Sequence, residues 1–266
     1  MGKLGKVIWA IALITVFVLT VMVINGFIQK LTYNPQNPIA TMEVENFGTV
    51  KIELYPDQAP ETVSNFIALS NRGFYDGLTF HRIVKDFMIQ GGDPEGKGTG
   101  GAKLSDLRDL NEGEEDKNYT IKGEFTANKV NNTIKMDEGT IAMARSDYSQ
   151  YSSSLSEASY NSGSSQFFIV TKKTNTLNGL YTGFGKVIEG MDIIHNIEAV
   201  EVKAADGSEE SKSAEVSTPV NAPKITSIRV ETNGVDYGLP QTLEPFDYNS
   251  WLYKQYGIDP NTTIVE

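Results

Sequence analysis

The pattern of hydrophobic and polar residues divides the chain into many short segments, most of which predict strands. Segments that alternate polar and apolar residues, or that stay apolar for a few residues, are typical of strands. Such segments lie at 41–45, 49–54, twice within 80–93, and at 118–121, 140–144, 166–171, 184–187 and 224–232. Apolar residues at helical spacing follow Pro60 and recur over 191–200, which predicts two helices.

About eight short strands with two helices predict an all-β fold. We expect a closed eight-stranded antiparallel barrel that is capped by the two helices. A parallel α/β sheet would need more helices between its strands. Residues 40–232 should form this domain, and residues 233–266 an aromatic-rich tail that packs on it or on a partner. The stretch 202–222 is rich in Ser, Ala and Glu, which predicts a flexible segment.

The N-terminus differs from the rest of the chain because residues 7–24 are uncharged and mostly apolar. A run of this length can cross a bilayer as a helix, and Lys3 and Lys6 before it predict that residues 1–6 lie in the cytoplasm. We therefore expect a transmembrane anchor over 7–28 and a linker over 29–39. A cleaved signal peptide is the alternative, but no small-residue cleavage pattern follows the run.

The composition of the chain argues against several classes of partner and of site. The net charge of −11 argues against nucleic acid as a partner. The chain has no cysteine and only two histidines, so we expect no disulfide, no metal site and no cofactor. A protein that lies outside the membrane and lacks disulfides is typical of a bacterial surface, so we expect a single-pass protein of a Gram-positive cell membrane.

The segment 80–93 contains the most informative side chains. Side chains alternate faces along a strand, so Met88 and Gln90 should point the same way, with Arg82 beside them on the neighbouring strand. A cation and an amide over an apolar floor suit an apolar ligand that carries a carbonyl group. Hydrolysis is not indicated, because no nucleophile–base pair accompanies these residues.

Several separated motifs occur in an order that resembles the cyclophilins. They are the segment 80–93, Gly-Thr-Gly-Gly at 98–101, Gly-Glu-Phe at 123–125, Met-Ala-Arg at 143–145, Ser-Ser-Gln-Phe-Phe-Ile at 164–169 and Phe-Gly-Lys-Val at 184–187. The chain is identified as similar to cyclophilin-type peptidyl-prolyl cis-trans isomerases over about residues 40–232, in a membrane-anchored bacterial form. The resemblance implies the capped barrel and a substrate groove on its outside.

The resemblance also implies the roles of site residues. Arg82 matches the catalytic arginine of the family. The residues that match substrate-binding positions are Phe87, Met88, Gln90, Ala144, Gln166, Phe168, Leu177 and Tyr181. Tyr181 stands where many members have histidine, and Arg145 replaces a common asparagine. Thr176 stands where many members have a rim tryptophan that contributes to cyclosporin binding, which implies weak affinity for that drug.

We expect a prolyl isomerase that acts on proline-containing secreted or surface polypeptides and assists their folding. Slow Xaa-Pro rotation can limit the folding of such chains. The alternative is a non-catalytic module or holdase chaperone that binds proline-containing segments without turning them over. Thr176 and the inserts at 103–118 and 147–163 motivate this alternative.

Overall fold

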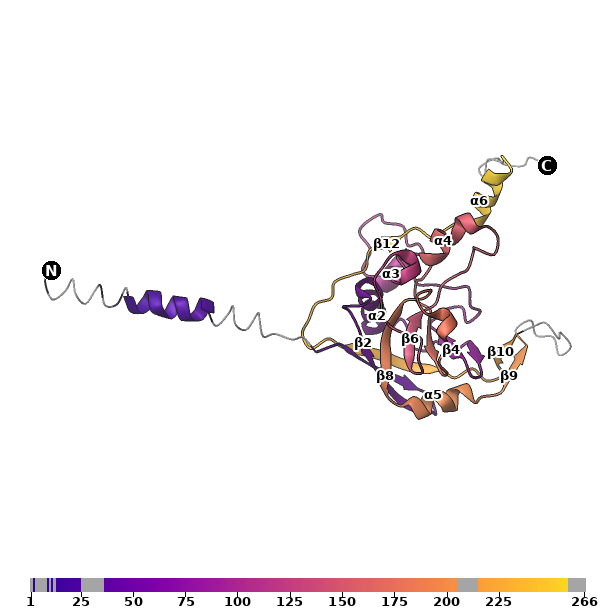
Figure 1. Cartoon of the computed structure of the whole chain (residues 1–266), viewed down its shortest axis with the longest axis horizontal. Helices are drawn as coiled ribbons and strands as arrows, with labels where there is room; N and C mark the ends of the chain where they lie inside the picture. Colours follow the sequence, from indigo (N-terminus) through magenta and orange to yellow (C-terminus); the bar gives the residue numbers. More distant parts are fainter. Residues whose placement is uncertain are drawn as a thin grey trace. The chain divides into compact units, whose positions relative to one another are not determined.

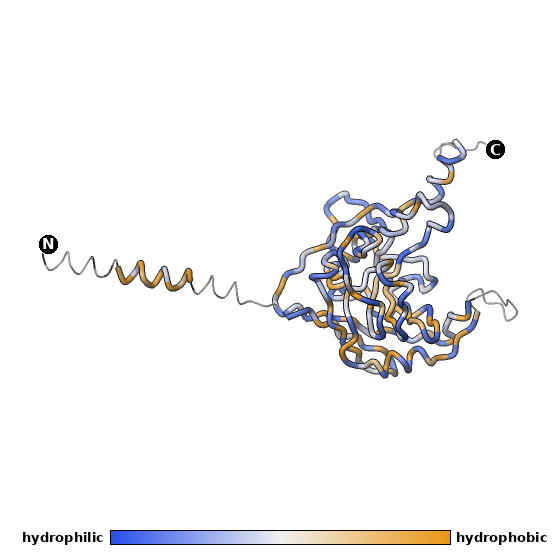
Figure 2. Tube along the Cα trace, viewed as in Figure 1, coloured by the Kyte–Doolittle hydropathy of each residue, from blue (hydrophilic) through white to orange (hydrophobic). Residues whose placement is uncertain are grey.

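The computed structural model describes residues 2, 9, 11, 13–24, 36–204 and 215–257, which belong to two compact units, 1–36 and 37–266. In the first unit, residues 13–24 are helical and mostly hydrophobic (Figure 2). Apolar side chains there, such as Phe17, are exposed. The anchor predicted over 7–28 and the linker over 29–39 lie partly outside the described residues. Within the described part, no helix is both long enough and apolar enough to cross a membrane.

The second unit is built on one antiparallel sheet of eight strands (Figure 1). In their spatial order the strands are β11 (Ile225–Glu231), β1 (Ile39–Val44), β2 (Gly48–Leu54), β8 (Gly183–Glu189), β6 (Thr140–Met143), β7 (Phe167–Val170), β4 (Met88–Gly91) and β3 (Arg82–Val84).

The predicted all-β class and strand number are confirmed, but the prediction of a closed barrel is wrong. The sheet is an open, curled half-barrel with β3 and β11 at its two ends. β3 is only three residues long, so no ladder joins it to β11. The chain before β3 makes a few backbone contacts across the gap instead, such as the hydrogen bond from Phe80 N to Pro223 O at 2.9 Å.

The two predicted helices are present as α2 (Pro60–Asn71) and α5 (Met191–Glu198). Further helices accompany them in the described residues: α3 (Leu104–Leu107), α4 (Ser156–Tyr160), α6 (Tyr248–Gln255) and the 3-10 turns η1 (Thr126–Asn128), η2 (Ser153–Leu155) and η3 (Asn175–Leu177). Two small two-stranded sheets pair β5 (Thr120–Ile121) with β12 (Thr242–Leu243), and β9 (Val202–Ala204) with β10 (Val216–Pro219). The flexible segment predicted over 202–222 is therefore strand at both described ends, whereas 205–214 lie outside the described residues.

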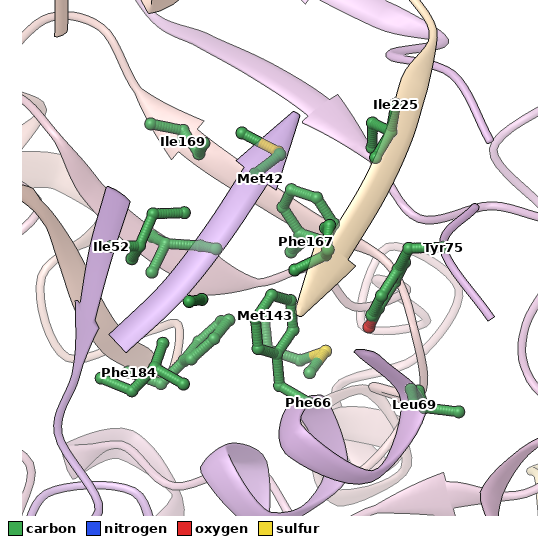
Figure 3. Packing of buried hydrophobic residues seen from close by; sticks show 14 of the residues in the cluster. Met42, Ile52, Phe66, Leu69, Tyr75, Met143, Phe167, Ile169, Phe184 and Ile225 are labelled. Atoms are coloured by element: carbon green, nitrogen blue, oxygen red, sulfur yellow. The ribbon is translucent and has the colours of Figure 1, made fainter. Parts of the chain in front are cut away.

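The main core lies between the sheet and α2 (Figure 3). Phe66 of α2 meets the ring of Phe167 edge-on, with centroids 5.7 Å apart, and lies 5.2 Å from the ring of Phe184. Because strand side chains alternate, the residues next to these core positions face outward. Four of them, Met88, Ala142, Phe168 and Val170, form a second, smaller buried cluster together with Met136, which lies outside the strands.

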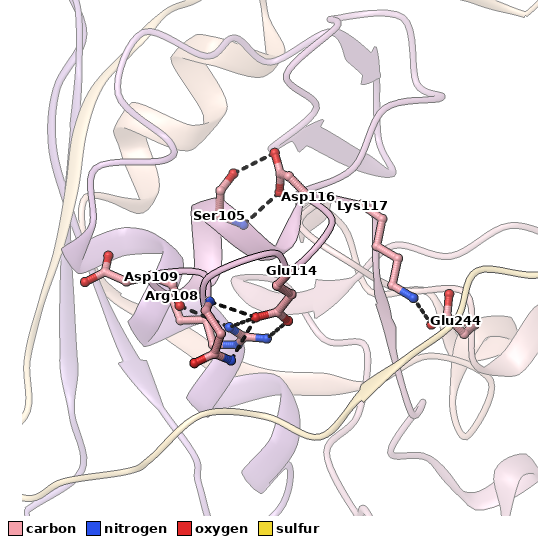
Figure 4. A network of polar contacts seen from close by, with 8 residues as sticks. Ser105, Arg108, Asp109, Glu114, Asp116, Lys117 and Glu244 are labelled. Carbon is pink, nitrogen blue, oxygen red and sulfur yellow. Dashed lines mark hydrogen bonds and ion pairs between the residues drawn. The ribbon is translucent and has the colours of Figure 1, made fainter.

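Polar contacts stabilise the insert at 103–118 and join it to the C-terminal tail (Figure 4). Within the insert, Arg108 pairs with Glu114 through both carboxylate oxygens. Lys117 then forms an ion pair with Glu244 of the tail. These contacts and the pairing of β5 with β12 hold the described part of the tail on the domain, although residues 258–266 lie outside the described residues.

Candidate active site

The structure gathers most of the predicted site residues around one pocket of about 270 Å³, here called the outer-face pocket. It is lined by Arg82, Phe87, Met88, Gln90, Ala144, Arg145, Phe168, Leu177 and Tyr181. The predicted residue that does not line it is Gln166, which contacts the pocket through Gln90. The predicted site residues therefore lie close together in the structure, whereas their roles in binding and catalysis stay predictions.

Strand register explains why these residues meet. Arg82 of β3 lies opposite Gln90 of β4, and Gln90 in turn lies opposite Phe168 of β7. Phe168 then lies opposite Ala142 of β6. Neighbours on the inner face, such as Ile89, belong to the main core. The alternation of side chains along these strands therefore places the core on one face of the sheet and the floor of the pocket on the other.

A chain of amide hydrogen bonds lines the polar edge of the pocket. Arg82 donates from Nη1 to Gln90 Oε1 at 3.2 Å, and Gln90 donates from Nε2 to Gln166 Oε1 at 2.9 Å. Gln166 passes the chain on by donating to the carbonyl oxygen of Gly100 at 2.8 Å. This sequence of bonds fixes which way each amide points, so that Gln90 presents an acceptor to the guanidinium.

Arg145 is a lining residue that the sequence marked only as a departure from the family. Its guanidinium carbon lies 4.6 Å from the ring centroid of Tyr181, within cation–π range, and its Nε donates to the carbonyl of Leu180. Tyr181 also meets the ring of Phe168 edge-on at 5.4 Å. Arg145 thus holds one wall of the pocket. The signal in the sequence was the arginine in place of a common asparagine.

A second hollow of about 390 Å³ shares Gln90, Ala144 and Arg145 with the outer-face pocket, so the two adjoin. Its far wall includes Tyr148 of the 147–163 insert and Phe246 of the tail, whose rings lie 5.0 Å apart. Sequence reasoning left the position of both segments open. Their aromatic content was the signal that they pack together.

His81 sits beside the site but takes no part in it. Its side chain is buried, and burial lowers the pKa of its imidazole, so the neutral form is favoured. Neither ring nitrogen has a hydrogen-bond partner among the described residues. His81 therefore belongs to the packing beside the pocket and not to its lining. The pocket itself contains no nucleophile–base pair.

Comparisons with known proteins agree on one family. The profile described as "Cyclophilin type peptidyl-prolyl cis-trans isomerase/CLD" matches residues 39–230. "Peptidyl-prolyl cis-trans isomerase B" of Bacillus subtilis is 39% identical over 154 residues, which cover 58% of this chain and 86% of that protein. "Peptidyl-prolyl cis-trans isomerase-like 1" of Rhizopus delemar is 37% identical over 161 residues, covering 60% and 81%.

A solved structure shares the fold. The crystal structure of a Cryptosporidium parvum cyclophilin type peptidyl-prolyl cis-trans isomerase in the presence of dipeptide ala-pro superposes with a TM-score of 0.53 at 28% sequence identity. The match covers 73% of this chain and 99% of the other. The family profile leaves residues 1–38 and 231–266 outside its match.

Proposed function

Because this chain belongs to the cyclophilin-type peptidyl-prolyl cis-trans isomerase family, we propose that its outer-face pocket catalyses rotation about Xaa-Pro bonds in extended polypeptides. The prediction of a prolyl isomerase is confirmed at the level of the family. One observation carries the proposal for the site: the Arg82 guanidinium stands at the edge of an apolar pocket and is oriented by Gln90.

The reaction needs no covalent step. Rotation about an Xaa-Pro bond breaks amide resonance, which accounts for a barrier of about 18–20 kcal/mol. In the twisted transition state the prolyl nitrogen regains a lone pair, to which a fixed guanidinium N–H can donate. The planar ground state offers no such acceptor, so the interaction lowers the barrier selectively.

The apolar part of the pocket has a separate task. Phe87, Met88, Phe168 and Leu177 form a surface that fits a proline ring. Holding the ring there leaves the preceding carbonyl free to turn. Removing the amide from water also favours the twisted state, because that state is less polar than the planar one. Proton transfer is not required, which agrees with the absence of a nucleophile–base pair in this pocket.

The test is cis–trans exchange of an Ala-Pro peptide, measured by NMR with the full chain and its Arg82→Ala variant. We expect the wild type to accelerate exchange and the variant to lose most of that acceleration, by about 10²–10³-fold. Arg72→Ala removes a comparably exposed arginine that pairs with Asp109 away from the pocket, and it should keep the wild-type rate. Wild-type exchange rates in a folded Arg82→Ala protein would contradict the assignment.

The alternative of a binding module or holdase gives a different result in the same experiment. Peptide signals would shift on binding to the wild-type chain, but the cis and trans forms would exchange no faster than in buffer. Neither the position of Thr176, which does not line the outer-face pocket, nor the inserts favour that outcome over catalysis.

We further propose that the chain is anchored in a cell membrane and assists folding on the outer side. The support is the uncharged run at 7–24 after two lysines, together with the exposed apolar side chains of the helix at 13–24. The chain has no cysteine, so single-cysteine variants report position cleanly. In intact Gram-positive cells, a membrane-impermeant maleimide should label the Ser149→Cys variant and leave Gly2→Cys unlabelled. Labelling of neither before lysis would contradict the proposal.

A further inference from the structure

An acidic side chain from outside the outer-face pocket holds the guanidinium of Arg82. Arg82 donates from Nε to Glu215 Oε1 and from Nη2 to Glu215 Oε2, both at 2.7 Å. This is a bidentate pair, in which two parallel N–H groups meet both carboxylate oxygens and fix the plane of the guanidinium. We propose that Glu215 is a positioning residue for the isomerase reaction, an inference that rests on the proposed role of Arg82.

The position of Glu215 follows from the hairpin of β9 and β10. Glu215 directly precedes β10, which packs against β3, the strand that begins with Arg82. β10 is anchored because Ser217 and Pro219 are buried. The hairpin is therefore held on the domain at the point where it presents Glu215 to the arginine.

The hydrogen bonds leave Arg82 able to act. Glu215 takes the edge formed by Nε and Nη2, while Nη1 lies 3.2 Å from Gln90 Oε1 and 3.8 Å from Met88 Sδ. A guanidinium has N–H donors on more than one edge of its plane. The outer N–H of Nη2 has no partner among the described residues, so it remains for a substrate. Glu215 thus fixes the guanidinium through the edge formed by Nε and Nη2.

Positioning matters here because Arg82 is otherwise weakly confined. Its side chain is 34% exposed and that of Glu215 is 46% exposed, so the pair adds little to the stability of the fold. Without the carboxylate, Gln90 alone would orient a long, flexible side chain. Small displacements of a catalytic group can cost a large part of the rate even when the fold is intact.

The pairing also holds the carboxylate in its charged form. The hydrogen bond from Arg82 lowers the pKa of Glu215 below its ordinary value, and burial works against that shift. At neutral pH the carboxylate is therefore ionised and able to accept both hydrogen bonds.

The experiment compares the full wild-type chain with Glu215→Ala and Glu215→Gln in the Ala-Pro exchange assay. We expect Glu215→Ala to lower kcat about tenfold with little change in KM, because positioning acts on the twisted state. Glu215→Gln keeps one acceptor oxygen and should lose less. The melting temperature should stay within about 2 °C of wild type in both variants.

Asp76→Asn is the matched control. Asp76 also binds an arginine bidentately, Arg229, at 2.8 and 2.6 Å, but away from the outer-face pocket. Its loss should leave kcat and KM unchanged. A second readout separates positioning from structure: the Arg82 Nε–H NMR signal should shift and exchange faster with water in Glu215→Ala but not in Asp76→Asn.

The outcomes separate this inference from the proposed function. If Arg82→Ala is inactive and Glu215→Ala keeps the wild-type kcat, the inference about Glu215 is wrong and the assignment of Arg82 stands. If Arg82→Ala keeps the wild-type rate, both are wrong. A higher kcat/KM with tighter peptide binding in Glu215→Ala would show that Glu215 competes with substrate, which also overturns positioning. In the Arg82→Ala background, Glu215→Ala should have no further effect.

Discussion

The start of α2 depends on a carboxylate from a distant part of the chain, and this dependence can be tested. Ala59, the residue that precedes the helix, has no side chain to cap it. The first free N–H groups of a helix need acceptors, and Glu124 supplies them. It accepts from the N–H of Glu61 at 3.0 Å, from the N–H of Thr62 at 2.8 Å and from the Thr62 hydroxyl at 2.7 Å.

The expected loss of stability in Glu124→Ala is the difference between two opposing effects. Glu124 is only 3% exposed, so replacing it with alanine leaves these buried donors without a partner. At about 1.5 kcal/mol for each bond to a charged acceptor, the gross loss is about 4–5 kcal/mol. Burial raises the pKa of Glu124 against the effect of its hydrogen bonds, so the carboxylate carries a desolvation cost that the variant removes. We therefore expect a net loss of about 3 kcal/mol for Glu124→Ala.

For a domain of this size the loss corresponds to a fall in melting temperature of about 6–12 °C, measured by calorimetry or circular dichroism. Glu124→Gln keeps one acceptor oxygen and should lose about half as much. Glu43→Gln is the control, because Glu43 also accepts from a threonine hydroxyl, that of Thr49, but in an exposed position. A fall of less than about 2 °C in Glu124→Ala, equal to that of the control, would refute the capping argument.

Two further predictions concern the segment that follows β4. Asp93 is buried, which raises the pKa of its carboxyl, but backbone N–H donors of the next loop outweigh burial and hold the pKa below its ordinary value. The ionised carboxylate therefore stabilises the fold above about pH 4, and this stabilisation is lost as the pH falls through the lowered pKa of Asp93 in the folded state. Asp93→Asn should accordingly flatten a plot of melting temperature against pH between about pH 2 and pH 5. Gly92 has φ +84°, and a Cβ there would lie 2.5 Å from the carbonyl oxygen of Ser165, so Gly92→Ala should cost more than about 2 kcal/mol of unfolding free energy. Gly113→Ala, at φ +79° in open space, should cost only the backbone strain of about 1 kcal/mol, and equal losses in urea titrations would contradict the clash.

The apolar half of the site could be predicted from the sequence because it follows from strand alternation. Once the segment 80–93 is assigned to two strands, Met88 and Gln90 must share a face, and the motif around Phe168 supplies the next strand. The two helices were predicted from a different local pattern, the helical spacing of apolar residues. Neither pattern predicts an open sheet, because nothing in a local pattern says that β3 stops after three residues.

The polar surroundings of Arg82 could not be predicted in the same way. Glu215 lies 133 residues further along the chain, within the stretch 202–222, whose composition predicts flexibility rather than a strand. The β-branched residues Val216 and Thr218 were the available signal for β10, but so short a run predicts little by itself. Glu124 was recognised only as part of a motif, and its capping role needs the distance to Thr62, which the sequence does not contain.

The two halves of the site differ in how firmly the sheet holds them. β7, which carries Phe168, pairs with a strand on each side, whereas β3, which carries Arg82, is an end strand that pairs only with β4. End strands have fewer backbone hydrogen bonds to break, so local opening should reach Arg82 before it reaches the apolar floor. An open sheet therefore places the proposed catalytic group at its least constrained edge. The packing of β10 on β3 and the pairing of Glu215 with Arg82 supply there the constraint that a neighbouring strand supplies elsewhere.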